Sequence, residues 1–98
     1  MKIVKEALAG TLESSDLLVK VSPGPGAGLE VVISSEVMQQ FGLQIDHVVR
    51  DTLARLGVTA GLVVVEDKGA LDCAIRARVQ TAVIRGAEAQ TIDWSALS

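Results

Sequence analysis

The chain has 98 residues and a net charge of −3, from nine basic and twelve acidic side chains. Nucleic-acid binding needs a concentrated basic surface and exposed aromatic side chains, and the only aromatic residues are Phe41 and Trp94, so this class of partner is excluded. Hydrophobic residues make up 49% of the chain, which predicts one globular domain, residues 1–98, with an aliphatic core.

Membrane insertion, secretion and cysteine-based metal binding are also excluded. No apolar run approaches the ~20 residues that span a bilayer, and the first residues lack the basic-then-apolar pattern of a signal peptide. The single cysteine, Cys73, forms no internal disulfide and builds no cysteine metal cluster. We therefore expect a cytoplasmic protein with no membrane partner and no metal site.

Two runs of alternating apolar residues open the chain and meet at a polar break. Residues 1–13 and residues 16–22 both have the period of two that is typical of β-strands. The alternating members are Leu8, Gly10 and Leu12 in the first run and Leu17, Val19 and Val21 in the second. This pattern predicts a β-hairpin with Ser14 and Ser15 at its exposed tip, where serine is usually an ordinary turn residue.

Residues 22–28 contain two prolines and three glycines, which predicts a loop. A phosphate-binding P-loop would continue with lysine into a helix, whereas residues 29–33 alternate as a third strand. We interpret the loop as a connector without a ligand role.

A first amphipathic helix follows, capped by Ser34 or Ser35, with Gly42 inside it and its end at Leu56. Its apolar face is formed by Val37, Phe41, Ile45, Val48, Thr52 and Leu56. Residues 62–65 are a short aliphatic run, which predicts a strand buried on at least one side.

A second helix is predicted from about residue 70 to residue 85. Its apolar stripe is formed by Leu71, Ile75, Val79 and Ala82, and Gly86 is predicted to end it. Residues 87–98 show no clear period, and we interpret them as a loosely docked tail in which Ile92 and Trp94 are the side chains able to dock.

The order of predicted elements is strand, strand, strand, helix, strand, helix, which indicates an α+β fold. Because the helical stripes face one way and the strands are half apolar, we expect a two-layer sandwich. Its sheet would be small, four-stranded and mostly antiparallel, with both helices on one face. The strand order stays open.

His47 and Cys73 carry the most reactive side chains, and neither has a recognisable catalytic partner. A general base needs a nucleophile or a substrate beside it, so we interpret His47 as a surface residue. Cys73 opens the second helix, where a thiol can become reactive, but a small, partly buried cysteine is the expected outcome.

Two separated motifs carry a family resemblance. The first is Gly10-Thr11-Leu12-Glu13-Ser14 followed by Asp16, and the second is Asp67-Lys68-Gly69-Ala70-Leu71-Asp72-Cys73 followed by Ala77-Arg78. In this order and in a chain of this length, they resemble the acyl carrier subunit of citrate lyase, its gamma chain.

The resemblance implies that Ser14 holds phosphoribosyl dephospho-coenzyme A through a phosphodiester. The precursor would be 2'-(5''-triphosphoribosyl)-3'-dephospho-CoA, attached by a prosthetic-group transferase. The thiol of the cofactor would carry acetyl or citryl as a thioester while citrate is cleaved to acetate and oxaloacetate. The implied partners are the alpha subunit, an acyl transferase, and the beta subunit, a citryl lyase, so this chain would have no catalytic residue of its own.

Other functions stay open at this point. The carrier subunit of malonate decarboxylase resembles this family in its prosthetic group and would leave the role of Ser14 unchanged. A regulatory or adaptor α+β module predicts an unmodified Ser14. A thiol enzyme that uses Cys73 predicts loss of activity in Cys73→Ala.

Arg78 and Ser15 are the two positions with unsettled roles. Arg78 falls inside the apolar stripe of the second helix, so it either pairs with Glu13, Glu66 or Asp67, or braces the serine loop or contacts a cofactor phosphate. Ser15 stands where the resemblance leads us to expect glycine. The turn is therefore predicted to be longer than two residues or strained, and the assignment to Ser14 over Ser15 depends on the motif alone.

Overall fold

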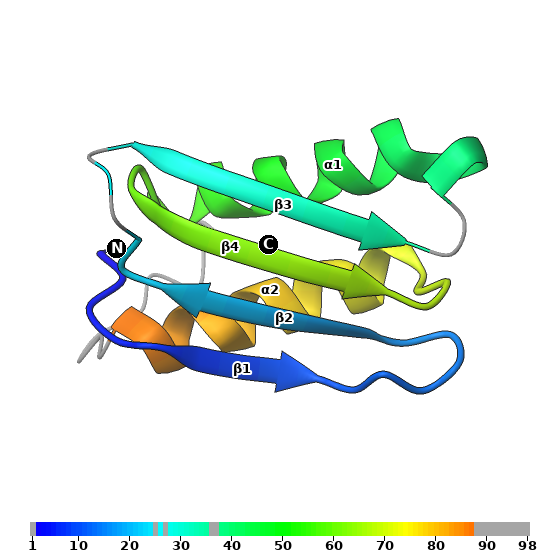
Figure 1. Cartoon of the computed structure of the whole chain (residues 1–98), viewed down its shortest axis with the longest axis horizontal. Coiled ribbons are helices and arrows are strands. Elements are labelled where there is room, and N and C mark those ends of the chain that lie inside the picture. The colour runs from blue at the N-terminus through cyan, green and yellow to red at the C-terminus, as the bar shows by residue number, and fades with distance from the viewer. Residues whose placement is uncertain (1, 25, 27, 36–37, 88–98) are drawn as a thin grey trace.

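The computed structural model describes residues 2–24, 26, 28–35 and 38–87, with the backbone alone described over residues 38–41. Within these residues the chain forms four strands and two helices in the predicted order (Figure 1). Their bounds are β1 (Ala7–Gly10), β2 (Leu17–Ser22), β3 (Leu29–Ser35), α1 (Met38–Arg55), β4 (Gly61–Asp67) and α2 (Asp72–Ala87).

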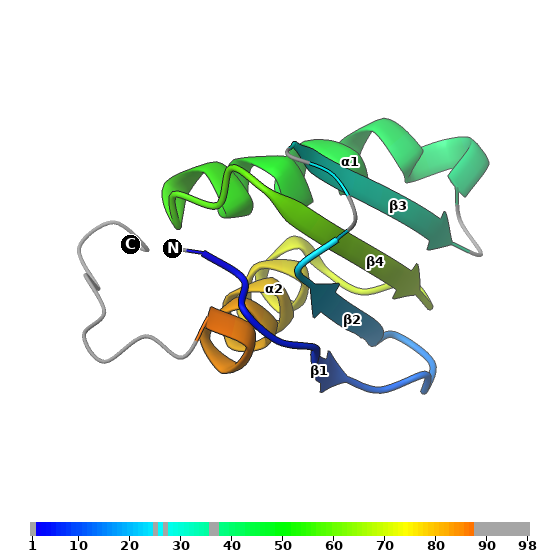
Figure 2. The same ribbon diagram turned by 60° about the vertical axis from the view of Figure 1, so that its left-hand side comes forward.

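The four strands form one mixed sheet in the order β1-β2-β4-β3. β2 pairs antiparallel with both β1 and β4, whereas β3 and β4 are parallel. The parallel pair requires a crossover connection, which α1 supplies. Both helices lie on the same face of the sheet (Figures 1 and 2), so the predicted two-layer α+β sandwich is confirmed.

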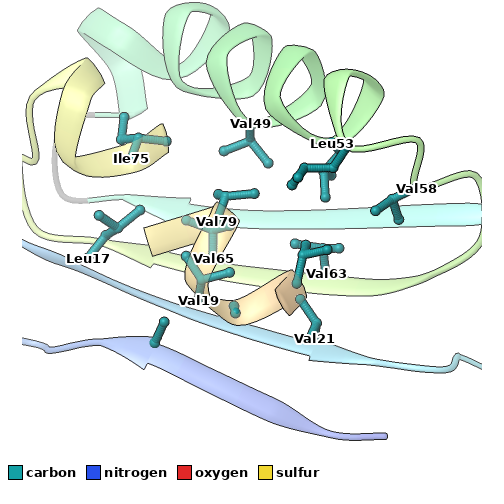
Figure 3. Close-up of a cluster of buried hydrophobic side chains, with 14 of the residues drawn as sticks. Leu17, Val19, Val21, Val49, Leu53, Val58, Val63, Val65, Ile75 and Val79 are labelled. Atoms are coloured by element: carbon teal, nitrogen blue, oxygen red, sulfur yellow. The ribbon is translucent and has the colours of Figure 1, made fainter. Parts of the chain in front are cut away.

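The core lies between this face of the sheet and the two helices. Central strands β2 and β4 contribute a row of aliphatic side chains, and the helices contribute the facing row (Figure 3). Each buried valine or leucine side chain contributes about 1.5–3 kcal/mol relative to an exposed one. The fully buried members include Leu17, Val19, Val21, Val49, Leu53, Val63, Val65, Ile75, Val79 and Val83.

Small residues let α2 pack closely against β1 and β2. A Cβ added at Gly86 would lie 2.7 Å from Val21 Cγ2 and 3.6 Å from Ala7 Cβ, so this contact leaves no room for a side chain. The carbonyl oxygen of Gly86 also accepts hydrogen bonds from the N–H groups of Val4 (3.0 Å) and Lys5 (3.1 Å). The prediction that Gly86 ends the helix was wrong, because this residue is a packing contact inside α2.

This close approach also decides which side of β1 faces the helices. Ala9 is 3% exposed and Leu8 is 51% exposed, so the predicted apolar member Leu8 faces outward and its neighbour Ala9 faces the core. The predicted strand over residues 1–13 was also too long, because β1 covers Ala7–Gly10 and Leu12 lies in the loop that follows. Leu71 precedes α2 and is 74% exposed, so its predicted place in the apolar stripe was also wrong. The other predicted members of that stripe, Ile75, Val79 and Ala82, are buried as expected.

The first helix keeps its predicted apolar face in the described part of the chain. Its buried predicted members, and Leu56 just beyond its end, are Ile45, Val48, Thr52 and Leu56. Val37, the side chain of Phe41 and residues 88–98 of the predicted tail lie outside the described residues. Ser34 and Ser35 are the last residues of β3. Residues 36–37, where the helix was expected to begin, lie outside the described residues, so a cap by Ser34 or Ser35 stays a prediction.

Candidate functional site

Ser14 and Ser15 occupy the centre of a β-turn between β1 and β2. The backbone N–H of Asp16 donates to the carbonyl oxygen of Glu13 at 3.1 Å, which closes the turn around the two serines. Both serines are exposed. The connection covers residues 11–16, so it is longer than a two-residue hairpin loop, as the missing glycine predicted.

Ser15 has a φ angle of 65°, the left-handed region that favours glycine. Among the described residues it is the one non-glycine residue with a positive φ. A non-glycine residue in this region costs roughly 1–2 kcal/mol. The turn is therefore both long and strained.

We expect Ser15→Gly to raise the free energy of unfolding by about 0.5–1 kcal/mol. Glycine removes the left-handed strain but adds conformational freedom to the unfolded chain, so only part of the strain energy is recovered. Urea unfolding of the two proteins measures the difference. Ser14→Gly is the matched control, with no gain expected because Ser14 has no positive φ; equal gains at both positions would contradict the strain at Ser15.

The serine turn is attached to the loop between β4 and α2. The N–H of Ser15 donates to the carbonyl oxygen of Lys68 at 2.8 Å, and the N–H of Lys68 donates to the carbonyl oxygen of Asp16 at 2.9 Å. These bonds extend the β2–β4 ladder beyond its last strand pair, Leu17 and Asp67. The two sequence motifs, about fifty residues apart in the chain, thus meet beside Ser14.

Asp16 is the centre of a hydrogen-bond network that fixes the base of the loop. Its Oδ1 accepts from the Leu17 N–H (2.8 Å), and its Oδ2 accepts from the Thr11 hydroxyl (2.8 Å). Arg78 donates from Nε to Oδ1 (3.2 Å) and from Nη2 to Oδ2 (3.1 Å). Thr11 Oγ1 in turn accepts from the Glu13 N–H (3.2 Å). Thr11 and Leu17, at the two ends of the loop, are therefore attached to Asp16, and the Glu13 N–H is attached through Thr11.

Arg78 therefore pairs with Asp16, and the three partners expected from the sequence, Glu13, Glu66 and Asp67, were wrong. The pair joins residues far apart in the chain, and no local sequence pattern reports such a contact. Arg78 reaches the loop from the middle of α2, and a two-point contact of this kind fixes orientation as well as distance. The ion pair of Arg78 is also its brace of the serine loop, because both are the same contact with Asp16. Contact of Arg78 with a cofactor phosphate stays a prediction.

The two-point hydrogen bond from Arg78, followed by those from the Leu17 N–H and Thr11, lowers the pKa of Asp16. A lowered folded-state pKa adds stability above the unfolded-state value of about 3.9, and this stability is lost as the pH falls through the folded-state value. We expect Asp16→Asn to be less stable than the natural chain at pH 7, with the difference shrinking below about pH 4. Urea unfolding at several pH values measures this trend.

Asp46→Asn is the matched control for this pH series. Asp46 pairs with Arg50 one helical turn away on the exposed side of α1, and such pairs contribute little. A stability loss in Asp16→Asn that stays constant from pH 7 to pH 3 would contradict a charged role for Asp16.

Asp67 organises the second motif in the same way. Its buried carboxylate accepts hydrogen bonds from the N–H groups of Gly69 (3.1 Å) and Ala70 (2.9 Å) and from the Ser35 hydroxyl (2.8 Å). The turn that holds Lys68 beside the serine loop is thus fixed from within. A carboxylate buried with these donors has a structural role, which accounts for the Asp-Lys-Gly-Ala run.

His47 and Cys73 take no part in this network. His47 is exposed on α1, as predicted, and Cys73 is exposed as well, so the prediction of a partly buried cysteine was wrong. Among the described residues, no group of three His, Cys, Asp or Glu side chains is arranged to hold a metal ion. The described helices also include none that is long and apolar enough to cross a membrane.

Comparison with known proteins places this chain in a class. Residues 4–86 match the family model described as "ACP: Malonate decarboxylase delta subunit (MdcD)", a class of acyl carrier proteins. A chain in the crystal structure of a Pseudomonas malonate decarboxylase hetero-tetramer in complex with malonate has the same fold, with a TM-score of 0.71. The match covers 83% of this chain and 82% of that chain at 24% sequence identity.

Individual relatives identify one family of carriers within this class. The chain is 66% identical over 97 residues to the citrate lyase acyl carrier protein of Pectobacterium carotovorum subsp. carotovorum (strain PC1), covering 99% of this chain and 100% of the relative. It is 65% identical over 98 residues to that of Enterobacter sp. (strain 638) and 64% identical over 98 residues to that of Rhodopseudomonas palustris (strain BisA53), each with full coverage of both chains. The chain belongs to the family of citrate lyase acyl carrier proteins, and the resemblance drawn from its motifs is confirmed.

Proposed function

We propose that the chain is the acyl carrier subunit of a citrate lyase complex, with phosphoribosyl dephospho-coenzyme A attached to Ser14. The observation that supports this most strongly is the exposed Ser14 side chain on a turn whose backbone is held by neighbouring segments. A carrier needs an attachment point that is accessible to a transferase and fixed at its base. Ser14 meets both requirements.

The surroundings of Ser14 fit a bulky covalent group. Residues 11–15 are all exposed, so a phosphodiester at this hydroxyl displaces no packed side chain. When bound, the group supplies a thiol that carries acetyl or citryl as a thioester. The chain's own residues hold the base of the arm, because Asp16, Arg78 and Lys68 keep the turn in place.

The partners that follow from this proposal are an alpha subunit that exchanges acyl groups, a beta subunit that splits citryl-carrier, and a prosthetic-group transferase. One arm on a fixed base can present the same thioester to two active sites at high effective concentration. The carrier itself then needs no catalytic residue. Cytoplasmic location is part of the same proposal, since these partners act on a soluble metabolite.

A second candidate is the carrier subunit of a malonate decarboxylase, which the family description and the related fold favour. The full-length identities of 57–66% to citrate lyase carriers, against 24% to the malonate decarboxylase chain, favour citrate lyase. Affinity capture with tagged carrier distinguishes them: we expect the alpha and beta subunits of citrate lyase to be recovered. Recovery of malonate decarboxylase subunits in their place would support the second candidate.

The experiment that tests the carrier role is the intact mass of the protein made with its transferase and cofactor precursor. We expect one phosphoribosyl dephospho-coenzyme A per chain, removed as a unit by phosphodiester cleavage. Protein made without the transferase is the control and should have the mass of the unmodified chain. An unmodified mass in both preparations would contradict the proposal and favour an adaptor module.

A further inference from the structure

A groove of about 640 Å³ lies between the first half of α1 and the start of α2. Gln44 and Ile45 of α1 line one side, and residues 69–73 line the other, with Ile75 also in the lining. Ile45 and Ile75 are almost completely buried, so the groove has an apolar floor. This size and this mostly apolar lining with few polar groups are typical of sites that bind small organic molecules.

Two polar side chains of the groove lining, Gln44 and Asp72, are hydrogen-bonded to each other. Gln44 Nε2 donates to Asp72 Oδ2 at 2.8 Å, joining the two helices across the groove. Each of these side chains keeps further hydrogen-bonding capacity, because the Gln44 amide has an acceptor oxygen and the Asp72 carboxylate has a second oxygen. A ligand that alternates methylene segments with amides would match such a lining.

The groove begins next to the serine turn. Lys68, whose carbonyl oxygen accepts from the Ser15 N–H, immediately precedes Gly69 in the lining. Figure 1 shows the β1–β2 loop and the β4–α2 loop at the same end of the sheet. From Lys68 to Cys73 the backbone spans at most about 18 Å, a distance that an arm made of a nucleotide and a pantetheine chain can cover.

We propose that this groove holds the pantetheine segment of the arm on Ser14 when the arm is not inserted in a partner's active site. The inference rests on the proposed function, and it adds a binding site on the carrier itself. The apolar floor contacts the methylene and methyl groups of pantetheine, and the Gln44 and Asp72 side chains bond its amides. The thiol of the arm then lies beside Cys73 at the rim.

Cys73 gives a direct measurement of this arrangement. The loaded protein is treated with diamide, a diazene that removes two electrons and two protons from a pair of thiols and is itself reduced to the hydrazine. The cofactor thiol and Cys73 then form an intramolecular disulfide, seen by intact mass as the loss of two hydrogens. We expect this disulfide to form at least tenfold faster than in the double variant Cys73→Ser/Thr81→Cys.

Thr81 is the comparison position because it lies half-buried on the same helix and does not line the groove. The reaction of each unloaded protein with free coenzyme A and diamide corrects for the intrinsic reactivity of the two thiols. Equal corrected rates of disulfide formation at the two positions would overturn the proposal. They would mean that the arm moves freely outside the groove, or that the groove binds a side chain of a partner protein instead.

Leu71→Glu tests the groove by a second route. Leu71 is exposed at the rim of the groove, so we expect the variant to fold and to be loaded at Ser14 like the natural chain. A charged side chain at the rim opposes binding of the methylene segments of the arm. We therefore expect the disulfide with Cys73 to form at least fivefold more slowly. Backbone amide shifts caused by loading should extend to residues 69–75 in the natural chain. Shifts confined to residues 11–16 and Lys68 would overturn the groove alone, whereas a mass without any adduct would overturn the carrier function together with it.

Discussion

Ser14→Ala is expected to abolish loading of the prosthetic group completely. The hydroxyl oxygen of Ser14 is the atom proposed to form the phosphodiester, and alanine has no group that replaces it. Ser14 is exposed, and exposed substitutions usually change stability by less than about 0.5 kcal/mol. Loss of the adduct in a protein with unchanged unfolding would therefore report the attachment site, and intact mass after coexpression with the transferase measures it.

Ser15→Ala is the matched control, because the two serines are neighbours in one turn and both are exposed. We expect Ser15→Ala to be loaded to the same extent as the natural chain. An adduct that survives in Ser14→Ala and disappears in Ser15→Ala would move the attachment site to Ser15. Such a result would leave the carrier function in place while correcting the residue.

Gly10→Ala is expected to destabilise the protein by about 4 kcal/mol or more. The φ angle of Gly10 is 95°, and an added Cβ would overlap the carbonyl oxygen of Leu17 and lie 3.3 Å from Arg78 Cδ. Relief of this overlap requires β1 to move away from β2 where Thr11 and Asp16 begin the serine loop. Because a domain of this size is stable by only about 5–15 kcal/mol, thermal unfolding should shift by many degrees.

Gly69→Ala separates the two causes of this loss. Gly69 has almost the same φ angle, 94°, but a Cβ added there meets no atom within 4 Å. We expect it to lose only the cost of the left-handed conformation, roughly 1–2 kcal/mol. Similar losses in the two variants would show that backbone conformation, and not the contact with Leu17, requires glycine at position 10.

The fold class was predictable because local patterns report it. The side of a strand or helix that faces the core carries apolar residues at a regular spacing, which can be recognised within a short stretch of sequence. This spacing is two residues for Leu17, Val19 and Val21, and four residues for Ile75 and Val79. The phase of β1 was not predictable in this way. Its bulky Leu8 faces outward because α2 approaches so closely that only small side chains fit beneath it.

The site around Ser14 also has features that the sequence predicted and features that only the structure shows. The sequence by itself determined the element order, the exposed serine turn and the family, because each follows from local spacing or from two motifs in the right order. Only the tertiary structure decided that Asp16 pairs with Arg78 and that Ser15 is bonded to Lys68. These contacts join residues that are far apart in the chain, and their geometry depends on how β4 and α2 pack beside the first hairpin.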